Sequence, residues 1–259
     1  MRLRLYQIDA FTSRVFAGNP AAVCPLERWL EDGTLQAIAA ENNLSETAFF
    51  VPEGRDYALR WFTPSIEVDL CGHATLASGF VVMRHLEPER SEVAFRTKSG
   101  RLAVWREGER FAMDFPALPP QPVEVPPALV AGLGRTPAAT LAALDYLAVF
   151  EGAREVAELT PDFAALARLD RRGVIATAPG DTCDFVSRFF APKAGIPEDP
   201  VTGSAHCLLV PYWAKRLNKR FLLARQISAR GGEIGCEDNG ARVTLIGAAA
   251  QYLEGTIEL

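Results

Sequence analysis

The sequence predicts an α+β fold of two similar lobes, each an antiparallel, barrel-like sheet wrapped round a central helix. The first observation behind this prediction is a motif that occurs twice, as RWFTPSIEVDLCGHATLASG over residues 60–79 and as RFFAPKAGIPEDPVTGSAHCLL over residues 188–209. The second is that each copy runs into a segment that is apolar nearly all round. A helix of that kind has to be covered on every side. A sheet that curls round each helix would provide the cover.

The N-terminal lobe is assigned to residues 1–117. Residues 2–11 alternate in polarity as RLRLYQIDAF, which is typical of a half-buried strand. The motif GNP at 18–20 is a turn, and residues 73–86 form the apolar central helix. The remaining elements follow from the same patterns: a helix over 30–42 and strands over 21–24, 46–51, 57–62, 92–96, 101–106 and 110–115.

The segment ALPPQPVEVPP, residues 117–127, is the predicted linker, because prolines continue neither a helix nor the middle of a sheet. The C-terminal lobe takes residues 118–259, although its last strand can return to the first lobe. Its expected elements are helices over 161–169 and 204–217 and strands over 146–150, 174–178, 185–190, 221–228, 233–236, 241–245 and 256–259.

Composition excludes several classes of function. The net charge is -5 and no stretch gathers Lys and Arg, so nucleic acid is not an expected partner. The N-terminus lacks the apolar core of a signal peptide, and no apolar run is long enough for a membrane span, so we expect a cytoplasmic protein. The five cysteines show no CxxC spacing, which argues against disulfides and structural zinc. Neither GxGxxG nor GxxxxGK[ST] is present, which gives a nucleotide cofactor no obvious site.

The two copies of the motif differ where chemistry is expected. Their alignment pairs Gly72 with Gly203, Glu67 with Glu198, Cys71 with Thr202 and His73 with Ser204. The shared positions other than the glutamates are mostly framework, and several of the differing ones can carry chemistry. The sequence therefore predicts a duplicated fold with one asymmetric active site.

Gly72 and Gly203 each directly precede a predicted helix. Free backbone N–H groups at a helix start favour anions, and glycine lets a ligand approach closely. A single glycine of this kind can simply shape a strand-to-helix turn. The paired occurrence favours a carboxylate-binding cleft between the lobes.

Four side chains are candidates for the chemistry. His73 follows the first glycine, and no HxH or HExxH motif accompanies it, so a metal site is not expected. Glu46, in NNLSETAFF, can be a helix-capping type of glutamate or an acid/base group, and Asp199, in IPEDPVTGS, can be a turn former or a positioned carboxylate. Ser204 can donate a hydrogen bond to a substrate. Thr202 stands where a second thiol would, which disfavours a two-thiol racemase.

At these residues the chain resembles the phenazine-biosynthesis PhzF-like family, within the diaminopimelate epimerase-like fold. The matching segments are QIDAFTSRVFAGNPAAVCPL, NNLSETAFF, DLCGHAT, EDPVTGSAH and EGTIEL. The resemblance implies two barrel-like lobes with the active site between them, a cofactor-free isomerase and a homodimer. It also implies Glu46 as the acid/base group, with His73, Asp199 and Ser204 in contact with the substrate.

The predicted function is therefore an isomerase that moves a proton within a small, carboxylate-bearing substrate. Three alternatives stay open at this stage: an amino-acid epimerase that uses Cys71, a ligand-binding protein without turnover, and a hydro-lyase that uses the same glutamate. The substrate and the pathway do not follow from the sequence.

Overall fold

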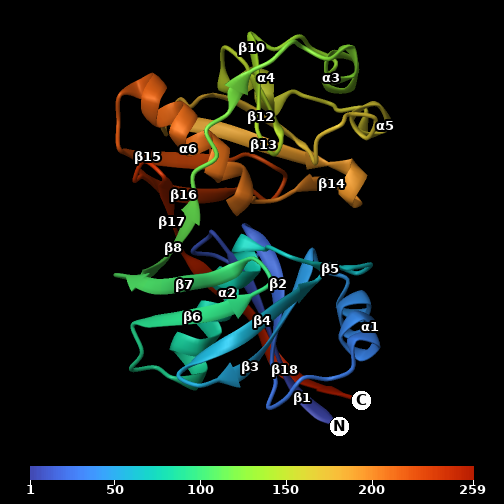
Figure 1. The fold of residues 1–259 in the computed structure, drawn as a ribbon, viewed down its shortest axis with the longest axis vertical. Helices are drawn as coiled ribbons and strands as arrows, with labels where there is room; N and C mark the ends of the chain where they lie inside the picture. Colours follow the sequence, from blue (N-terminus) through green and yellow to red (C-terminus); the bar gives the residue numbers. More distant parts are fainter. The chain divides into compact units, whose positions relative to one another are not determined.

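The computed structural model describes all 259 residues and separates into two compact units. One unit contains Met1–Asp114 together with Ile246–Leu259, and the other contains Phe115–Leu245. Strands and helices occur in both, as the α+β prediction requires (Figure 1). None of the helices combines the length and the apolar character that a membrane-spanning helix needs.

Apart from β5 and β18, the first unit follows the order of elements that the sequence predicts. Its strands are β1 (Arg2–Ala10), β2 (Asn19–Pro25), β3 (Glu46–Glu53), β4 (Asp56–Phe62), β5 (Glu67–Val68), β6 (Glu92–Thr97), β7 (Gly100–Glu107), β8 (Arg110–Pro116) and β18 (Ala249–Glu258). Its helices are α1 (Asp32–Asn42) and α2 (Gly72–Val81), the second of which continues as a π-helix, η1 (Val82–Leu86).

The sheet of this unit is mixed, because the antiparallel pairing that the sequence predicts is interrupted by two parallel pairs. Strand β2 runs parallel to β3, and β4 runs parallel to β6, whereas β1 with β2 and β3 with β4 are antiparallel. Parallel neighbours need a crossover connection. Helix α1 provides it between β2 and β3, and α2 lies in the connection between β4 and β6.

The two helices cover opposite faces of the sheet. Every residue of α2 is buried, and the helix contacts β1, β2, β3, β7 and β18. Helix α1 packs through Leu35, Ile38 and Ala39 on the outer face, against Phe49 and Phe62. The sheet is therefore wrapped round α2, and the apolar character of that helix is explained by its complete burial.

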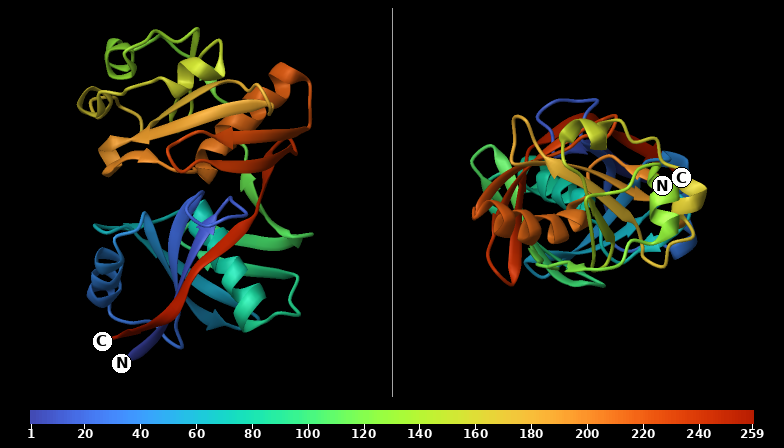
Figure 2. Two further views of the ribbon diagram at one scale, coloured as in Figure 1. Left: turned by 180° about the vertical axis from the view of Figure 1, so that it is seen from behind. Right: turned by 90° about the horizontal axis from the view of Figure 1, so that it is seen from above.

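The final strand belongs to the sheet of the first unit. Strand β18 pairs antiparallel with β1 along its length, with a bulge between Gln7 and Ile8. The two chain ends lie side by side, and the N–H of Leu259 donates to the carbonyl of Met1 at 2.7 Å (Figure 2). The sequence predicted only residues 256–259 of this strand.

The second unit repeats the arrangement with more helices. Its strands are β9 (Gln121–Pro122), β10 (Ala139–Ala142), β11 (Tyr146–Val149), β12 (Val174–Pro179), β13 (Phe185–Ala191), β14 (Ile196–Asp199), β15 (Phe221–Gln226), β16 (Gly232–Asp238) and β17 (Arg242–Gly247), which ends just past the boundary between the units. Its helices are α3 (Pro127–Leu133), α4 (Ala153–Ala157), α5 (Phe163–Leu166), η2 (Pro192–Ala194) and α6 (Gly203–Leu217).

The parallel pairs of the second unit correspond to those of the first. Strand β11 runs parallel to β12 across a connection that holds α4 and α5, and β13 runs parallel to β15 across α6. Trp213 of α6 stacks on Phe185 and donates from its indole N–H to Thr177 at 3.0 Å. Helix α6 is therefore the central helix of this unit.

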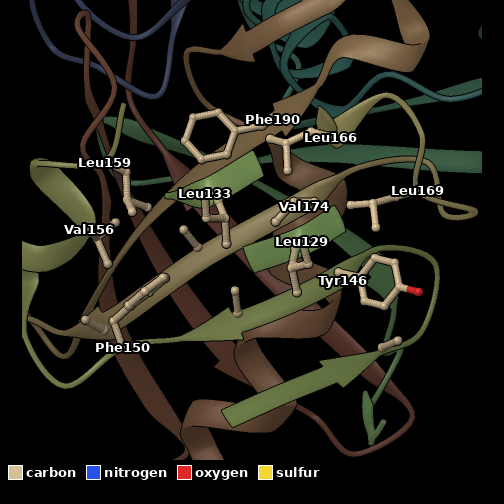
Figure 3. Packing of buried hydrophobic residues seen from close by; sticks show 14 of the residues in the cluster. Leu129, Leu133, Tyr146, Phe150, Val156, Leu159, Leu166, Leu169, Val174 and Phe190 are labelled. Carbon is tan, nitrogen blue, oxygen red and sulfur yellow. The ribbon is translucent and has the colours of Figure 1, made fainter. Parts of the chain in front are cut away.

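The opposite face of β11–β13 is covered by α3, α4 and α5. Figure 3 shows this cluster, in which Leu129 and Leu133 of α3, Val156 of α4 and Leu166 of α5 pack with Phe190. Helices α3 and α4 were not predicted from the sequence, and α5 is shorter than the helix predicted over 161–169. Each is only one or two turns long, which is too short for a clear apolar period. Strand β9 also lies within the predicted linker and pairs with β10 at its edge.

The glutamates that the two motif copies share are part of the framework. Arg60 of β4 donates from Nε and Nη2 to the two carboxylate oxygens of Glu67 at 2.8 and 2.9 Å. Arg188 of β13 binds Glu198 in the same bidentate way at 2.7 and 2.8 Å. Each pair fixes the short strand that leads into a central helix, because a bidentate pair restrains both side chains.

The packing of α2 makes a stability prediction. A Cβ added at Gly79 would lie 2.6 Å from Cγ1 of Val104 on β7, whereas one added at Gly33 of α1 meets nothing within 4 Å. Overpacking a filled core costs about 1–3 kcal/mol. We expect Gly79→Ala to lower the free energy of unfolding by that amount, measured by urea denaturation. Gly33→Ala, the control, should change it by less than about 1 kcal/mol, in the stabilising direction; equal effects of the two changes would contradict the packing.

Candidate active site

A group of four polar side chains lies where α2 begins. Asn19 and Glu46 are the first residues of the parallel strands β2 and β3, so both stand at the same end of the sheet. Cys71 is the N-cap of α2 and His73 is its second residue. All four side chains are buried. The fold thus brings together Glu46 and His73, which are 27 positions apart in the sequence.

The imidazole of His73 lies between acidic and amide groups. Its Nε2 is 3.1 Å from Oε2 of Glu46, an ion-pair distance, and neither atom has a partner with hydrogen-bond geometry. Its Nδ1 is 3.2 Å from Nδ2 of Asn19 and 3.6 Å from Sγ of Cys71. Because an amide nitrogen only donates, we assign Nδ1 as the acceptor in neutral His73, which places the ring proton on Nε2, toward Glu46.

The surroundings of His73 favour its charged form. Burial alone would lower the pKa of His73, but the neighbouring Cys71 and Glu46 outweigh burial and raise that pKa well above its usual value of 6.5. Burial, together with the charge of Glu46, raises the pKa of the Cys71 thiol to about 11. The thiol is therefore protonated near neutral pH.

Glu46, Cys71 and His73 also have the residue types of a metal site. One ligand atom from each lies within 4.8 Å of the others. However, the thiol lies beside Nδ1 and the carboxylate beside Nε2, so the ring stands between them. A chelating set would direct its ligand atoms at one point. The imidazole ring therefore lies between the thiol and the carboxylate.

The cysteines make a second prediction, on reactivity. Burial raises the pKa of Cys24 and Cys207 to about 12, and it raises the pKa of Cys236 and of half-buried Cys183 as well. The thiolate is the reactive form of cysteine. In the folded protein at about pH 7.5, we therefore expect a thiol reagent to modify none of the cysteines, or Cys183 alone. Mass spectrometry before and after addition of urea checks this. Rapid modification of Cys71 in the folded state would contradict a protonated, buried thiol.

A second polar group lies where α6 begins. Thr202, its N-cap, donates from Oγ1 to Oδ2 of Asp199 at 2.5 Å. Gln226 of β15 accepts from the backbone N–H of Thr202 at 2.8 Å and donates to the carbonyl of Asp199 at 2.7 Å. The carboxylate of Asp199 is thereby held at the end of β14, at the start of the central helix of the second unit.

Ser204, the second residue of α6, has a different partner. Its Oγ accepts a hydrogen bond from Nη2 of Arg172 at 3.0 Å, and Arg172 is bound in turn by the fully buried Asp145. Neither N-cap side chain, Cys71 in α2 or Thr202 in α6, accepts a hydrogen bond from its own helix. The first N–H groups of both helices, at Gly72 and Gly203, therefore lack side-chain caps.

Comparisons with known proteins place this geometry in a family. The model of the phenazine biosynthesis-like proteins (PhzC-PhzF) matches residues 8–255. The chain belongs to this family. A protein of Pseudomonas aeruginosa named as an uncharacterized isomerase is 53% identical over 259 residues, with 100% of both chains covered. A crystal structure of an Enterococcus faecalis protein of the PhzF family has 48% identity, a TM-score of 0.98 and full coverage of both chains.

These relatives support the predicted isomerase class. More distant structures support the fold: a hydroxyproline epimerase of Agrobacterium vitis superimposes with a TM-score of 0.64 at 10% identity, over 99% of this chain and 92% of its own. The diaminopimelate epimerase-like fold predicted for this PhzF-like chain is thereby confirmed.

The sequence-predicted residues of this PhzF-like chain fall into two groups. Glu46, His73 and Gly72 lie in the first unit, and Asp199, Ser204 and Gly203 lie in the second. The sequence patterns did not mark Asn19, Arg172, Asp145 and Gln226 as members of these groups. Two of them could have been noticed, because Asn19 begins an apolar strand and Asp145 directly precedes one. Gln226 offered no such signal.

Proposed function

We propose that this protein is an isomerase that moves a proton within a small, carboxylate-bearing substrate, with Glu46 as the acid/base group and without a cofactor. The observation that supports this best is the buried contact of 3.1 Å between Glu46 and His73. A buried carboxylate beside an imidazole that can carry or lose a proton is a suitable proton carrier. Its family membership is consistent with isomerase chemistry.

In the proposed reaction Glu46 takes a proton from a carbon of the substrate. The C–H bond breaks, its electron pair moves along the conjugated system, and the proton returns from Glu46 to a different atom of that system. Nothing else is gained or lost. Nε2 of His73 lies 3.1 Å from Oε2 of Glu46, and we propose that the other carboxylate oxygen, Oε1, takes up the proton.

The remaining predicted residues are proposed to hold the substrate. The uncapped N–H groups at Gly72 and Gly203 suit a carboxylate, since helix starts favour anions. Asp199 is proposed to accept hydrogen bonds from amino or hydroxyl groups of the substrate. Ser204 is proposed to donate a hydrogen bond to an acceptor atom of the substrate. Their fixed hydrogen-bond partners support this role, because a side chain that is already oriented loses less freedom when it binds.

A solvent-exchange experiment tests the proposal. Small carboxylate metabolites are incubated with the protein in D₂O and analysed by mass spectrometry and NMR. An isomerase gives a product of unchanged mass in H₂O, and deuterium at the carbon that receives the proton in D₂O. A product that has lost water would indicate a hydro-lyase, and binding without exchange would indicate a ligand-binding protein; either result would reject the proposal.

An epimerase that uses Cys71 is the second candidate, and the contact between Sγ and Nδ1 of His73 at 3.6 Å favours it. The pKa of about 11 of this thiol argues against it as a base. Cys71→Ser should abolish exchange at the α-carbon of an amino acid if the thiol is the base. If Glu46 is the base, we expect the same variant to keep most of its exchange activity.

A further inference from the structure

A group of three side chains in the second unit occupies the place that corresponds to Glu46 and His73 in the first. Asp145 directly precedes β11, Arg172 lies two residues before β12, and Ser204 is the second residue of α6. Strands β11 and β12 are parallel, so Asp145 and Arg172 stand at the same end of the sheet. The corresponding residues of the first unit are Asn19 at the start of β2, Glu46 at the start of β3 and His73 in α2.

The guanidinium of Arg172 is held firmly on one side. Its Nε donates to Oδ1 of Asp145 at 3.0 Å, and its Nη2 donates to Oδ2 at 2.6 Å. Asp145 is completely buried, and the guanidinium also lies over the ring of Phe189, 5.2 Å from its centre. A bidentate pair with a buried carboxylate fixes the plane of the guanidinium.

The other side of Arg172 carries unused donors. None of its hydrogen bonds uses Nη1, and its side chain is 35% exposed. Since a guanidinium only donates, the contact at 3.0 Å requires Oγ of Ser204 to accept. The hydroxyl hydrogen of Ser204 is then available to donate to a ligand. Two adjacent side chains therefore present N–H and O–H donors that the protein does not use.

We infer that Arg172 is a specificity-determining residue that binds, together with Ser204, a carboxylate group of the substrate. This inference rests on the proposed function, because it concerns the same substrate. Two neighbouring donors match the two oxygens of a carboxylate. The charges of Arg172 and Asp145 offset each other, so the site favours a singly charged group over a doubly charged phosphate.

Binding of benzoate, compared with that of benzamide and of inorganic phosphate, tests the inference by NMR titration of the full chain. Removing Arg172 alone would leave buried Asp145 without a partner, so the variant to use is Asp145→Asn with Arg172→Gln, which removes both charges together. Its fold is checked by thermal denaturation. Arg168→Met is the matched control, because Arg168 is an exposed arginine four residues away.

The wild type and Arg168→Met are expected to bind benzoate more tightly than benzamide or phosphate. The double variant should lose at least about 10-fold in benzoate affinity, and Ser204→Ala should lose less. Equal binding of benzoate and benzamide by the wild type, or full affinity in the folded double variant, would overturn the inference. The same titration with Glu46→Gln separates the inference about Arg172 from the proposed role of Glu46. If this variant keeps both the preference for benzoate and the proton-exchange activity, the role of Glu46 is rejected and the inference about Arg172 stands.

Discussion

Glu46→Gln is expected to lower the rate of proton exchange into substrate by at least about 10³-fold while the protein stays folded. Glutamine has almost the same shape as glutamate, so the contact of 3.1 Å with His73 can persist. It has no group that takes up and releases a proton near neutral pH. The loss should therefore appear in kcat, with little change in the affinity for a carboxylate ligand.

The same substitution gives a readout that needs no substrate. In the wild type, the neighbouring acidic groups hold the pKa of His73 well above its usual value despite burial. Glu46→Gln removes one of the two groups that raise this pKa, so we expect the pKa of His73 to fall. The chain has three histidines, so their NMR titrations can be assigned by mutation.

Glu41→Gln is the matched control for both measurements. Glu41 is an exposed residue of α1, five positions before Glu46, and its substitution removes the same charge from the same unit. We expect full exchange activity and an unchanged titration of His73. The assignment of Glu46 would be wrong if Glu46→Gln kept its turnover, or if the titration of His73 were the same in both variants.

The fold was largely readable from the sequence because apolar periods and turn residues were strong in its long elements. The central helix over 73–86 was predicted nearly as it stands in α2 and η1, since it is apolar all round. The parallel pairs were not predicted. Strand direction depends on which strands become neighbours, and the alternation within a single strand carries no information about that.

The residues of the candidate site were predicted where a motif marked them. Glu46 and His73 were identified by their motifs, and the structure then showed that they touch. The shared glutamates of the repeat looked like possible chemistry and prove to be ion-pair partners of Arg60 and Arg188. Arg172 escaped notice because a charged residue beside Arg171 in RRG reads as a solvated turn. Only the contact with buried Asp145 distinguishes it.

His206 makes the second large prediction, that the protein loses stability in mild acid. Its side chain is fully buried in α6, Nδ1 lies 2.8 Å from the carbonyl of Thr202, and Nε2 has no hydrogen-bond partner. Since a carbonyl only accepts, Nδ1 carries the ring proton. Burial lowers the pKa of His206 from 6.5 to about 4, because a charged ring here would lack a partner.

The direction in which stability changes with pH follows from the pKa of His206 in the unfolded and in the folded chain. Below about pH 6.5 the unfolded chain binds a proton at His206, whereas the folded chain binds that proton only below about pH 4. The free energy of unfolding therefore falls as the pH is lowered from about 6.5 to about 4, and the contribution of His206 is constant below that range. The expected loss is about 3 kcal/mol. His206→Asn keeps an N–H donor for Thr202 and does not titrate, so its free energy of unfolding should fall about 3 kcal/mol less than that of the wild type between about pH 7.5 and 4. Urea denaturation across this pH range measures the free energy of unfolding of both proteins. Buried carboxylates affect the wild type and the variant alike, so any difference between them comes from His206. Parallel pH profiles would show that His206 is not the group responsible.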